Sequence, residues 1–318
     1  GDVYKRQVTH ACSDDAASFL SSLMSASIES TLGAPPARLP WRRRGALGRL
    51  LANPAAVAGG VLLLLILLAA VTAPWVFPSD PLDMVGPPIL WPGQDPGFWL
   101  GTDTMGRDVA AGLAHGARVS LTVGFTAALL SLVIGIAVGA AAGYFGGWVD
   151  MALMRVTELL QTIPSFLLVV VIVAIVRPSV PVIALSIGVA SWPVIARLVR
   201  AEFRTLRESE FVQAARSLGY SHARIALLEI LPNALPPVIV TTSVLVANAI
   251  LMESALSFMN MGDPNAVSWG SMIGSAREML RTAWYLTALP GVSIILTVLS
   301  LNLLGDALND AFNPRLSR

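Results

Sequence analysis

Long apolar runs, separated by shorter polar segments, dominate the chain. Six of these runs reach or approach the roughly 20 residues that a helix needs to cross a bilayer. They lie at about 53–77, 118–143, 156–176, 181–199, 236–258 and 284–304. The pattern predicts an all-α polytopic membrane protein with six transmembrane helices, in one membrane domain over residues 41–318.

Several residues predict where these helices begin, bend and pack. Asn53 followed by Pro54 is typical of a helix start. An amphipathic stretch from Asp150 to Thr162 precedes the third run, and Pro164 is expected to kink or restart it. Further bends are predicted at Pro193 and Pro290, although local packing kinks explain them equally well. In the second run a stripe of small residues favours close packing inside the molecule over a dimer motif; it consists of Gly135, Gly139 and Gly143.

The distribution of charge predicts the orientation in the membrane. Arginines cluster before the first run, at 38, 42, 43, 44 and 49, and again between Arg197 and Arg224. Residues 78–117 carry five aspartates against Arg107. By the positive-inside rule both termini are therefore expected in the cytoplasm, and a nucleic-acid patch is a weak explanation so close to a span.

One polar segment, Glu210 to Asn233, stands out from the apolar background. Ser209 is placed to cap a first short helix, with Phe211, Ala214, Ala215 and Leu218 on one face. Gly219 suits the left-handed residue that ends it. Ser221 is placed to cap a second helix that ends at Pro232. An ordinary interhelical loop would be shorter and would need no order of its own, so we expect a docking surface.

Composition narrows the function. Charged residues make up 13% of the chain and the mean hydropathy is +0.69, whereas a soluble domain has about a quarter charged residues. The only lysine is Lys5, so a phosphate-binding P-loop is excluded. Cys12 is the single cysteine and the three histidines are scattered, so we expect no metal site, no cofactor and no catalytic residues in this chain.

Residues 1–40 are expected to be disordered or non-native. The opening GDVYKRQ resembles a translated sequencing-adapter remnant, and the Ser- and Ala-rich stretch after it lacks the apolar core of a signal peptide.

The polar segment resembles the EAA loop of ABC-importer permeases, within a coupling region at about 202–235. The family pattern E-A-A-x-x-x-G, followed by an apolar-Leu-Pro ending, is matched here by Gln213, Ala214, Ala215, Arg216 (an x position), Gly219, Ile230, Leu231 and Pro232. Gln213 departs from the usual glutamate: it keeps the shape and the hydrogen bonding but loses the charge.

Three further segments resemble permeases for dipeptides, oligopeptides and nickel. The first is a G-T-D-x-x-G-R-D motif at Gly101, Thr102, Asp103, Gly106, Arg107 and Asp108. The second is E-x-x-L-S-F, beginning at Glu253, with Ser268-Trp269-Gly270 shortly after it. The third is the ending from Asn302 to Leu316. With the loop these make four motifs in order, and the resemblance covers about residues 43–316.

The resemblance implies a type I importer permease fold in a bacterial or archaeal cell membrane. It implies that the chain assembles with a second permease subunit, two ABC ATPase subunits and an external solute-binding protein. The chain is expected to contact lipid and not nucleic acid. The EAA-like loop would dock on the ATPase. The transported solute is left open among dipeptides, longer peptides, nickel chelates and some sugars.

Two groups of charged residues keep two interpretations each. Asp103, Arg107 and Asp108 either receive the solute-binding protein or, slightly favoured, hold the outer loop through ion pairs. Glu253 either lines the translocation path or hydrogen-bonds to the outer loop. Arg155 and Glu158 are expected to form a local pair.

Two other classes of protein compete with the permease. A secondary transporter or channel predicts inverted repeats and several intramembrane charges, of which only Glu253 is present. A membrane enzyme predicts clustered acid–base groups, which the sequence does not supply.

Overall fold

The computed structural model describes residue 48 and residues 52–312, and throughout this range the regular elements are helices. The prediction for residues 1–40 lies outside these residues, as does the Asn313–Leu316 part of the C-terminal motif. The long helices are α3 (Pro54–Val76), α4 (Val109–Phe145), α7 (Val180–Arg207), α10 (Leu231–Phe258) and α12 (Tyr285–Phe312). Shorter elements are α5 (Gly147–Thr162), α6 (Ser165–Val176), α8 (Glu210–Ser217), α9 (His222–Arg224), the π-helical segment η1 (Ile225–Ile230), α11 (Trp269–Ala276) and η2 (Arg277–Met279).

Within the described residues, five helical stretches are long and apolar enough to cross a membrane. The pair α5–α6 is a sixth candidate, but it bends by 81° between the two helices. The third run at 156–176 is therefore divided between two helices, and the predicted break at Pro164 is confirmed. Ile163 is extended (φ −91°, ψ 126°) because the proline ring disfavours helical geometry in the residue before it.

Other helix ends differ from the apolar runs. α4 begins at Val109 rather than Arg118, α7 continues to Arg207, and the helix predicted from Pro236 already begins at His222. Polar residues at the ends of a membrane helix keep the helical geometry, and hydrophobicity alone does not mark where they stop. Pro193 and Pro290 both lie inside continuous helices.

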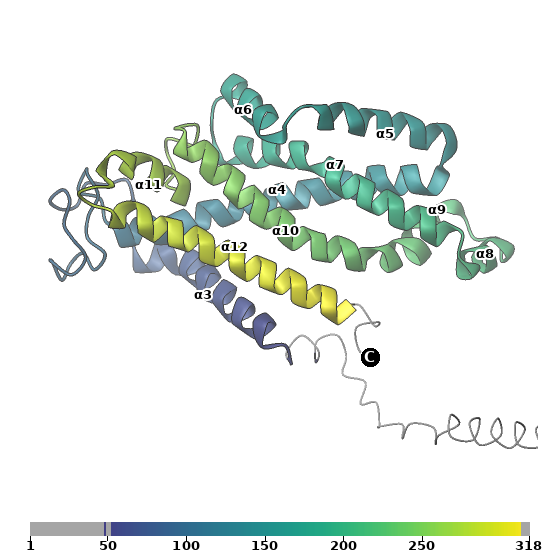
Figure 1. Cartoon of the computed structure of the whole chain (residues 1–318), viewed down its shortest axis with the longest axis horizontal. Helices are drawn as coiled ribbons and strands as arrows, with labels where there is room; N and C mark the ends of the chain where they lie inside the picture. The colour runs from purple at the N-terminus through teal and green to yellow at the C-terminus, as the bar shows by residue number, and fades with distance from the viewer. Residues whose placement is uncertain (1–47, 49–51, 313–318) are drawn as a thin grey trace, which may run out of the picture. The chain divides into compact units, whose positions relative to one another are not determined.

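The packing centre is the pair α4 and α7, which lie against each other over much of their length (Figure 1). The stripe of small residues in α4 faces α7, as the internal-packing interpretation predicted. A Cβ added to Gly135 would lie 2.6 Å from Ile195 Cβ, and one added to Gly143 would lie 2.6 Å from Phe203 Cβ. The glycines thus allow the two backbones to approach closely.

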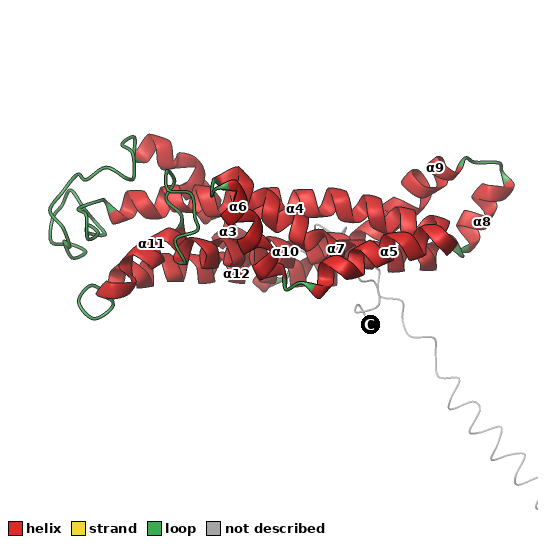
Figure 2. Cartoon of the chain, turned by 90° about the horizontal axis from the view of Figure 1, so that it is seen from above, coloured by secondary structure: helices red, strands yellow, loops and turns green. Residues whose placement is uncertain are grey.

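The remaining long helices pack around this pair. α10 contacts α4, α7 and α12, and α3 contacts α4 and α12. The polar segment with α8 and α9 lies at one end of the bundle, and the loop before α4 lies with α11 at the other end (Figure 2). The segment with α8 and α9 and the loop before α4 are therefore separated by the length of the long helices.

Candidate functional site

The segment from α8 to η1 is an ordered helical turn. α8 ends at Ser217, and Gly219 has φ +77°. The Tyr220 N–H donates to the Ala215 carbonyl at 3.1 Å, and the Gly219 N–H donates to the Arg216 carbonyl at 3.0 Å. This pair of bonds is the Schellman motif, which needs a left-handed residue at the glycine position. The predicted role of Gly219 in the turn is confirmed.

The two predicted caps behave differently. The Ser221 hydroxyl accepts from the Arg224 N–H at 3.4 Å, as expected for a cap. Ser209 occupies the cap position of α8, but its hydroxyl donates to the Leu206 carbonyl instead. The capping bond predicted for Ser209 is therefore wrong, because a nearer acceptor at the end of α7 competes for the hydroxyl.

The predicted apolar face of α8 is divided between the core and the surface. Val212 and Ala215 are buried in the cluster that also holds Phe203, Ile225 and Ile230. Four large apolar side chains of α8, the residue after it and η1 lie outside that cluster and are exposed in this chain: Phe211, Leu218, Leu227 and Leu228. We refer to these four exposed apolar side chains together as the loop patch.

The second helix does not end at Pro232, contrary to the sequence prediction. The helical stretch runs from His222 to Phe258 and includes η1, where the Leu231 N–H donates five residues back to the Ala226 carbonyl. Pro232 tolerates this position because it follows the widened π turn at the start of α10. Ile230, Leu231 and Pro232 therefore connect the turn rigidly to a membrane helix.

Gln213 has a bond that sequence reasoning missed. Its side-chain amide donates to the Glu208 carbonyl at 3.1 Å, across the junction of α7 and α8. A glutamate at this position has no N–H to donate when it is ionised. The departure from the family pattern thus supplies a local stabilising bond, and only the fold brings Glu208 within reach.

Side chains also join this segment to the neighbouring helices. The Tyr144 hydroxyl lies 2.8 Å from His222 Nδ1, and Arg207 Nη1 donates to the Tyr144 carbonyl at 3.1 Å. Close by, Arg200 and Asp150 form a two-point ion pair between α7 and α5, with Nη2 2.7 Å from Oδ2. The predicted local pair of Arg155 and Glu158 is confirmed at 3.4 Å, on the exposed face of α5.

The loop motif at the opposite end is held by the main chain. Asp103 Oδ1 accepts from the N–H groups of Met105 (2.8 Å) and Arg107 (2.9 Å). Asp108 caps α4 through the Ala110 N–H at 2.8 Å. Within residues 52–312 no ion pair joins Asp103, Arg107 or Asp108. The predicted structural role is right for the side chains of Asp103 and Asp108, but the predicted ion pairs with Arg107 are wrong, because both carboxylates accept hydrogen bonds from main-chain amides instead.

Glycines and Thr102 complete this loop. Gly101 and Gly106 both have φ +78°, and a Cβ on either would collide with a backbone carbonyl, that of Leu90 or of Gly86. The buried Thr102 accepts from the Leu90 N–H at 3.0 Å, and its carbonyl accepts from the Tyr285 hydroxyl at 2.9 Å. The motif thus fixes the loop against the start of α12.

Glu253 is buried between α10 and α4. Its carboxylate accepts from Ser257 at 2.7 Å and from Ser120 at 3.1 Å. The structure therefore places it in a polar contact between two helices, and its assignment to the path stays a prediction. Within residues 52–312 no cluster of three or more His, Cys, Asp or Glu is arranged to hold a metal ion.

A bundle of apolar helices with an ordered polar turn at one end is the architecture of a polytopic membrane protein. The family described as "Binding-protein-dependent transport system inner membrane component" matches residues 131–318, and the "N-terminal TM domain of oligopeptide transport permease C" matches residues 40–92. The chain belongs to this family of binding-protein-dependent permeases. It is a membrane subunit of an ABC importer, and ATP hydrolysis belongs to partner subunits.

Individual relatives cover most of the chain. It is 38% identical to the di/tripeptide transport system permease protein DppC of Pseudomonas aeruginosa, over 83% of this chain and 89% of the relative. It is 37% identical to the dipeptide transport system permease protein DppC of Alkalihalophilus pseudofirmus (87% and 90%) and 34% identical to the glutathione transport system permease protein GsiD of Pectobacterium atrosepticum (88% and 92%).

A solved structure has the same fold. An inward-facing MetNI methionine ABC transporter matches with a TM-score of 0.53 at 18% identity, over 64% of this chain and 97% of that one. The type I importer permease fold expected from the resemblance is thus confirmed, and the secondary transporter or channel is not favoured.

Proposed function

We propose that the chain forms part of the path for short peptides in an ATP-driven importer. The di/tripeptide, dipeptide and glutathione permeases named above support this class of solute. The complete transporter would contain a second permease subunit, two ATPase subunits and an external solute-binding protein. The chain itself would need no cofactor.

The proposal has a defined orientation. The arginines between Arg197 and Arg224 belong to α7, α8 and α9, next to the loop patch in the chain, and the acidic residues belong to the loop before α4, at the other end of the bundle (Figure 2). The positive-inside rule then puts the loop patch and both termini in the cytoplasm.

The single observation that carries the mechanism is the continuity of the helix from His222 to Phe258. A short turn that docks on the ATPase and continues into a membrane helix transmits displacement as a rigid body. The ATPase would bias this element between two positions, which is what coupling between two sites requires. The exposed Leu218 and Leu228 of the loop patch would enter the ATPase surface, while the buried Ala215 maintains the turn.

The test uses the complete reconstituted transporter and measures ATPase co-purification and ATP-driven peptide uptake. Leu218→Asp should lose both while the chain still inserts, because Leu218 is 72% exposed in the chain and its replacement leaves the fold intact. Gly219→Pro and Ala215→Asp should also lose uptake without losing insertion. Leu280→Asp makes the same replacement at an exposed leucine outside both the loop patch and the membrane spans, and it controls for apolar loss elsewhere. Normal co-purification and uptake in Leu218→Asp would refute the docking assignment.

A further inference from the structure

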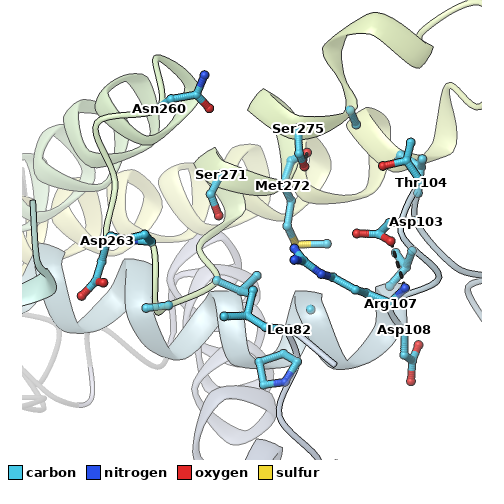
Figure 3. A pocket seen from close by; sticks show the side chains of 18 residues that line it. Leu82, Asp103, Thr104, Arg107, Asp108, Asn260, Asp263, Ser271, Met272 and Ser275 are labelled. Atoms are coloured by element: carbon cyan, nitrogen blue, oxygen red, sulfur yellow. Dashed lines mark hydrogen bonds between the residues drawn. The ribbon is translucent and has the colours of Figure 1, made fainter. Parts of the chain in front are cut away.

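A pocket lies at the end of the bundle opposite the loop patch (Figure 3). Its volume is about 220 Å³, and it lies between the loop before α4, the segment after α10, and α11. Its polar lining includes Asp103, Arg107, Asp108, Asn260, Asp263 and Ser275, and its apolar lining includes Leu82 and Met272. We call it the Arg107 pocket.

Arg107 is the unusual member of this lining. Its side chain extends toward Met272 (Figure 3), and its Nε is buried without a hydrogen-bond partner in the described part of the chain. A buried donor that is left unsatisfied is destabilising, and more so when the group is charged. The arginine therefore favours an acceptor that the isolated chain does not provide.

The aspartates of the pocket are already committed to main-chain amides. Asp103 and Asp108 are held as described above, and Asp263 accepts from the N–H groups of Asn265 (2.9 Å) and Val180 (3.0 Å). Each carboxylate has a structural role in its own turn or cap, and none of them forms an ion pair with Arg107. The guanidinium of Arg107 is the one cationic group in the lining of this pocket, so it is the group that attracts an anionic acceptor from outside.

A guanidinium binds a carboxylate through two parallel N–H···O bonds, so an acidic group is the acceptor that matches it best. The size of the pocket restricts the source. Sites for whole small-molecule ligands usually measure about 300–1,000 Å³, and this pocket is smaller. A single side chain reaching in from a docked protein fits better than a complete peptide.

We propose that the Arg107 pocket receives an aspartate or glutamate side chain of the solute-binding protein and so fixes the docked position of that protein. This rests on the proposed function, which puts this end of the bundle on the external side of the membrane, where the solute-binding protein docks. Arg107 contacts Asp103 only through its own main-chain N–H and carbonyl, so a substitution of its side chain leaves the loop bonds in place.

The test measures the affinity of the solute-binding protein for the complete transporter in lipid nanodiscs. Arg107→Gln should weaken this affinity roughly tenfold at low salt and flatten its dependence on salt. Arg107→Lys should give an intermediate loss, because lysine keeps the charge but not the two-point geometry. Arg281→Gln, an exposed arginine outside the pocket, is the matched control and should bind like the unaltered protein.

Replacing the acidic residues of the solute-binding protein one at a time identifies the partner. The correct one should show non-additive losses with Arg107→Gln in a double-mutant cycle. Unchanged affinity and salt dependence in Arg107→Gln would overturn the proposal. A second result would also overturn it: Arg107→Gln binds the solute-binding protein normally but loses uptake only of peptides with a free C-terminal carboxylate. The carboxylate that Arg107 binds would then come from the solute. Absence of ATP-driven uptake by the unaltered transporter would instead contradict the proposed function itself.

Discussion

The hydroxyl of Tyr144 lies 2.8 Å from Nδ1 of His222, with the two rings edge-on at 5.8 Å between centroids. Tyr144 is at the cytoplasmic end of α4 in the proposed orientation, and His222 is the first residue of α9. The bond therefore connects the segment that bears the loop patch to the helix at the centre of the bundle, independently of the covalent connection to α10.

Removing this bond should loosen the coupling between ATP hydrolysis and transport. Tyr144→Phe keeps the ring and loses only the hydroxyl, at a cost of about 0.5–1.5 kcal/mol. We expect less peptide uptake per ATP hydrolysed, with normal assembly. Tyr220→Phe is the matched control, because the ring of Tyr220 packs under Arg224 and would keep that contact. An unchanged ratio of uptake to hydrolysis in Tyr144→Phe would show that the bond carries no coupling.

Close packing of α4 on α7 should be sensitive to a single methyl group. A Cβ on Gly139 would lie 2.8 Å from Val199 Cβ and would also collide with the Ala196 carbonyl. Gly139→Ala is therefore expected to lower the free energy of unfolding by about 1–3 kcal/mol, measured as a lower Tm in detergent. Gly291→Ala in α12 has no neighbour within 4 Å of the added carbon and should be neutral or slightly stabilising. Equal Tm changes for both variants would contradict the packing account.

Gln213 offers a test of the local bond to Glu208. Gln213→Glu removes the donor and adds a negative charge beside Glu208 and Glu210. We expect faster hydrogen exchange of the amides in α8, since the lost bond is worth about 0.5–1.5 kcal/mol. Gln213→Leu removes the bond without adding charge, so the difference between the two variants measures repulsion alone. Exchange that stays at the unaltered rate in both would rule out a stabilising bond.

Glu253 should matter for the contact between α10 and α4. Glu253→Gln keeps an acceptor for Ser257 and Ser120, whereas Glu253→Ala leaves both hydroxyls without it. We expect Tm to change little in the first variant and to fall in the second, by an amount equivalent to about 1–3 kcal/mol. Uptake measured in Glu253→Gln then tests separately whether Glu253 lines the translocation path. Lost uptake at an unchanged Tm would support a charged group in the path, whereas normal uptake would contradict that assignment.

The apolar runs predicted five of the membrane helices and their order, and the sixth run corresponds to the bent pair α5–α6, but the runs did not predict where the helices end. A run such as 118–143 marks only the apolar part of a helix, whereas α4 continues for nine residues before Arg118 because Asp108 caps it farther upstream. The position of Gly219 was predictable because a local rule, the left-handed residue after a helix, is sufficient. The missing cap at Ser209 was not predictable in the same way, since the carbonyl that competes for its hydroxyl is that of Leu206, at the end of α7.

The sequence by itself determined the membrane class, the family motifs, the break at Pro164 and the glycine turn, because each depends on composition or on residues close together in the chain. Tertiary structure alone decided that the turn continues as a helix into α10, that the aspartates of the outer loop bind amides rather than Arg107, and that Tyr144 meets His222. Those relationships join residues that are far apart in the chain or that compete for one partner, and only packing determines which contact is made.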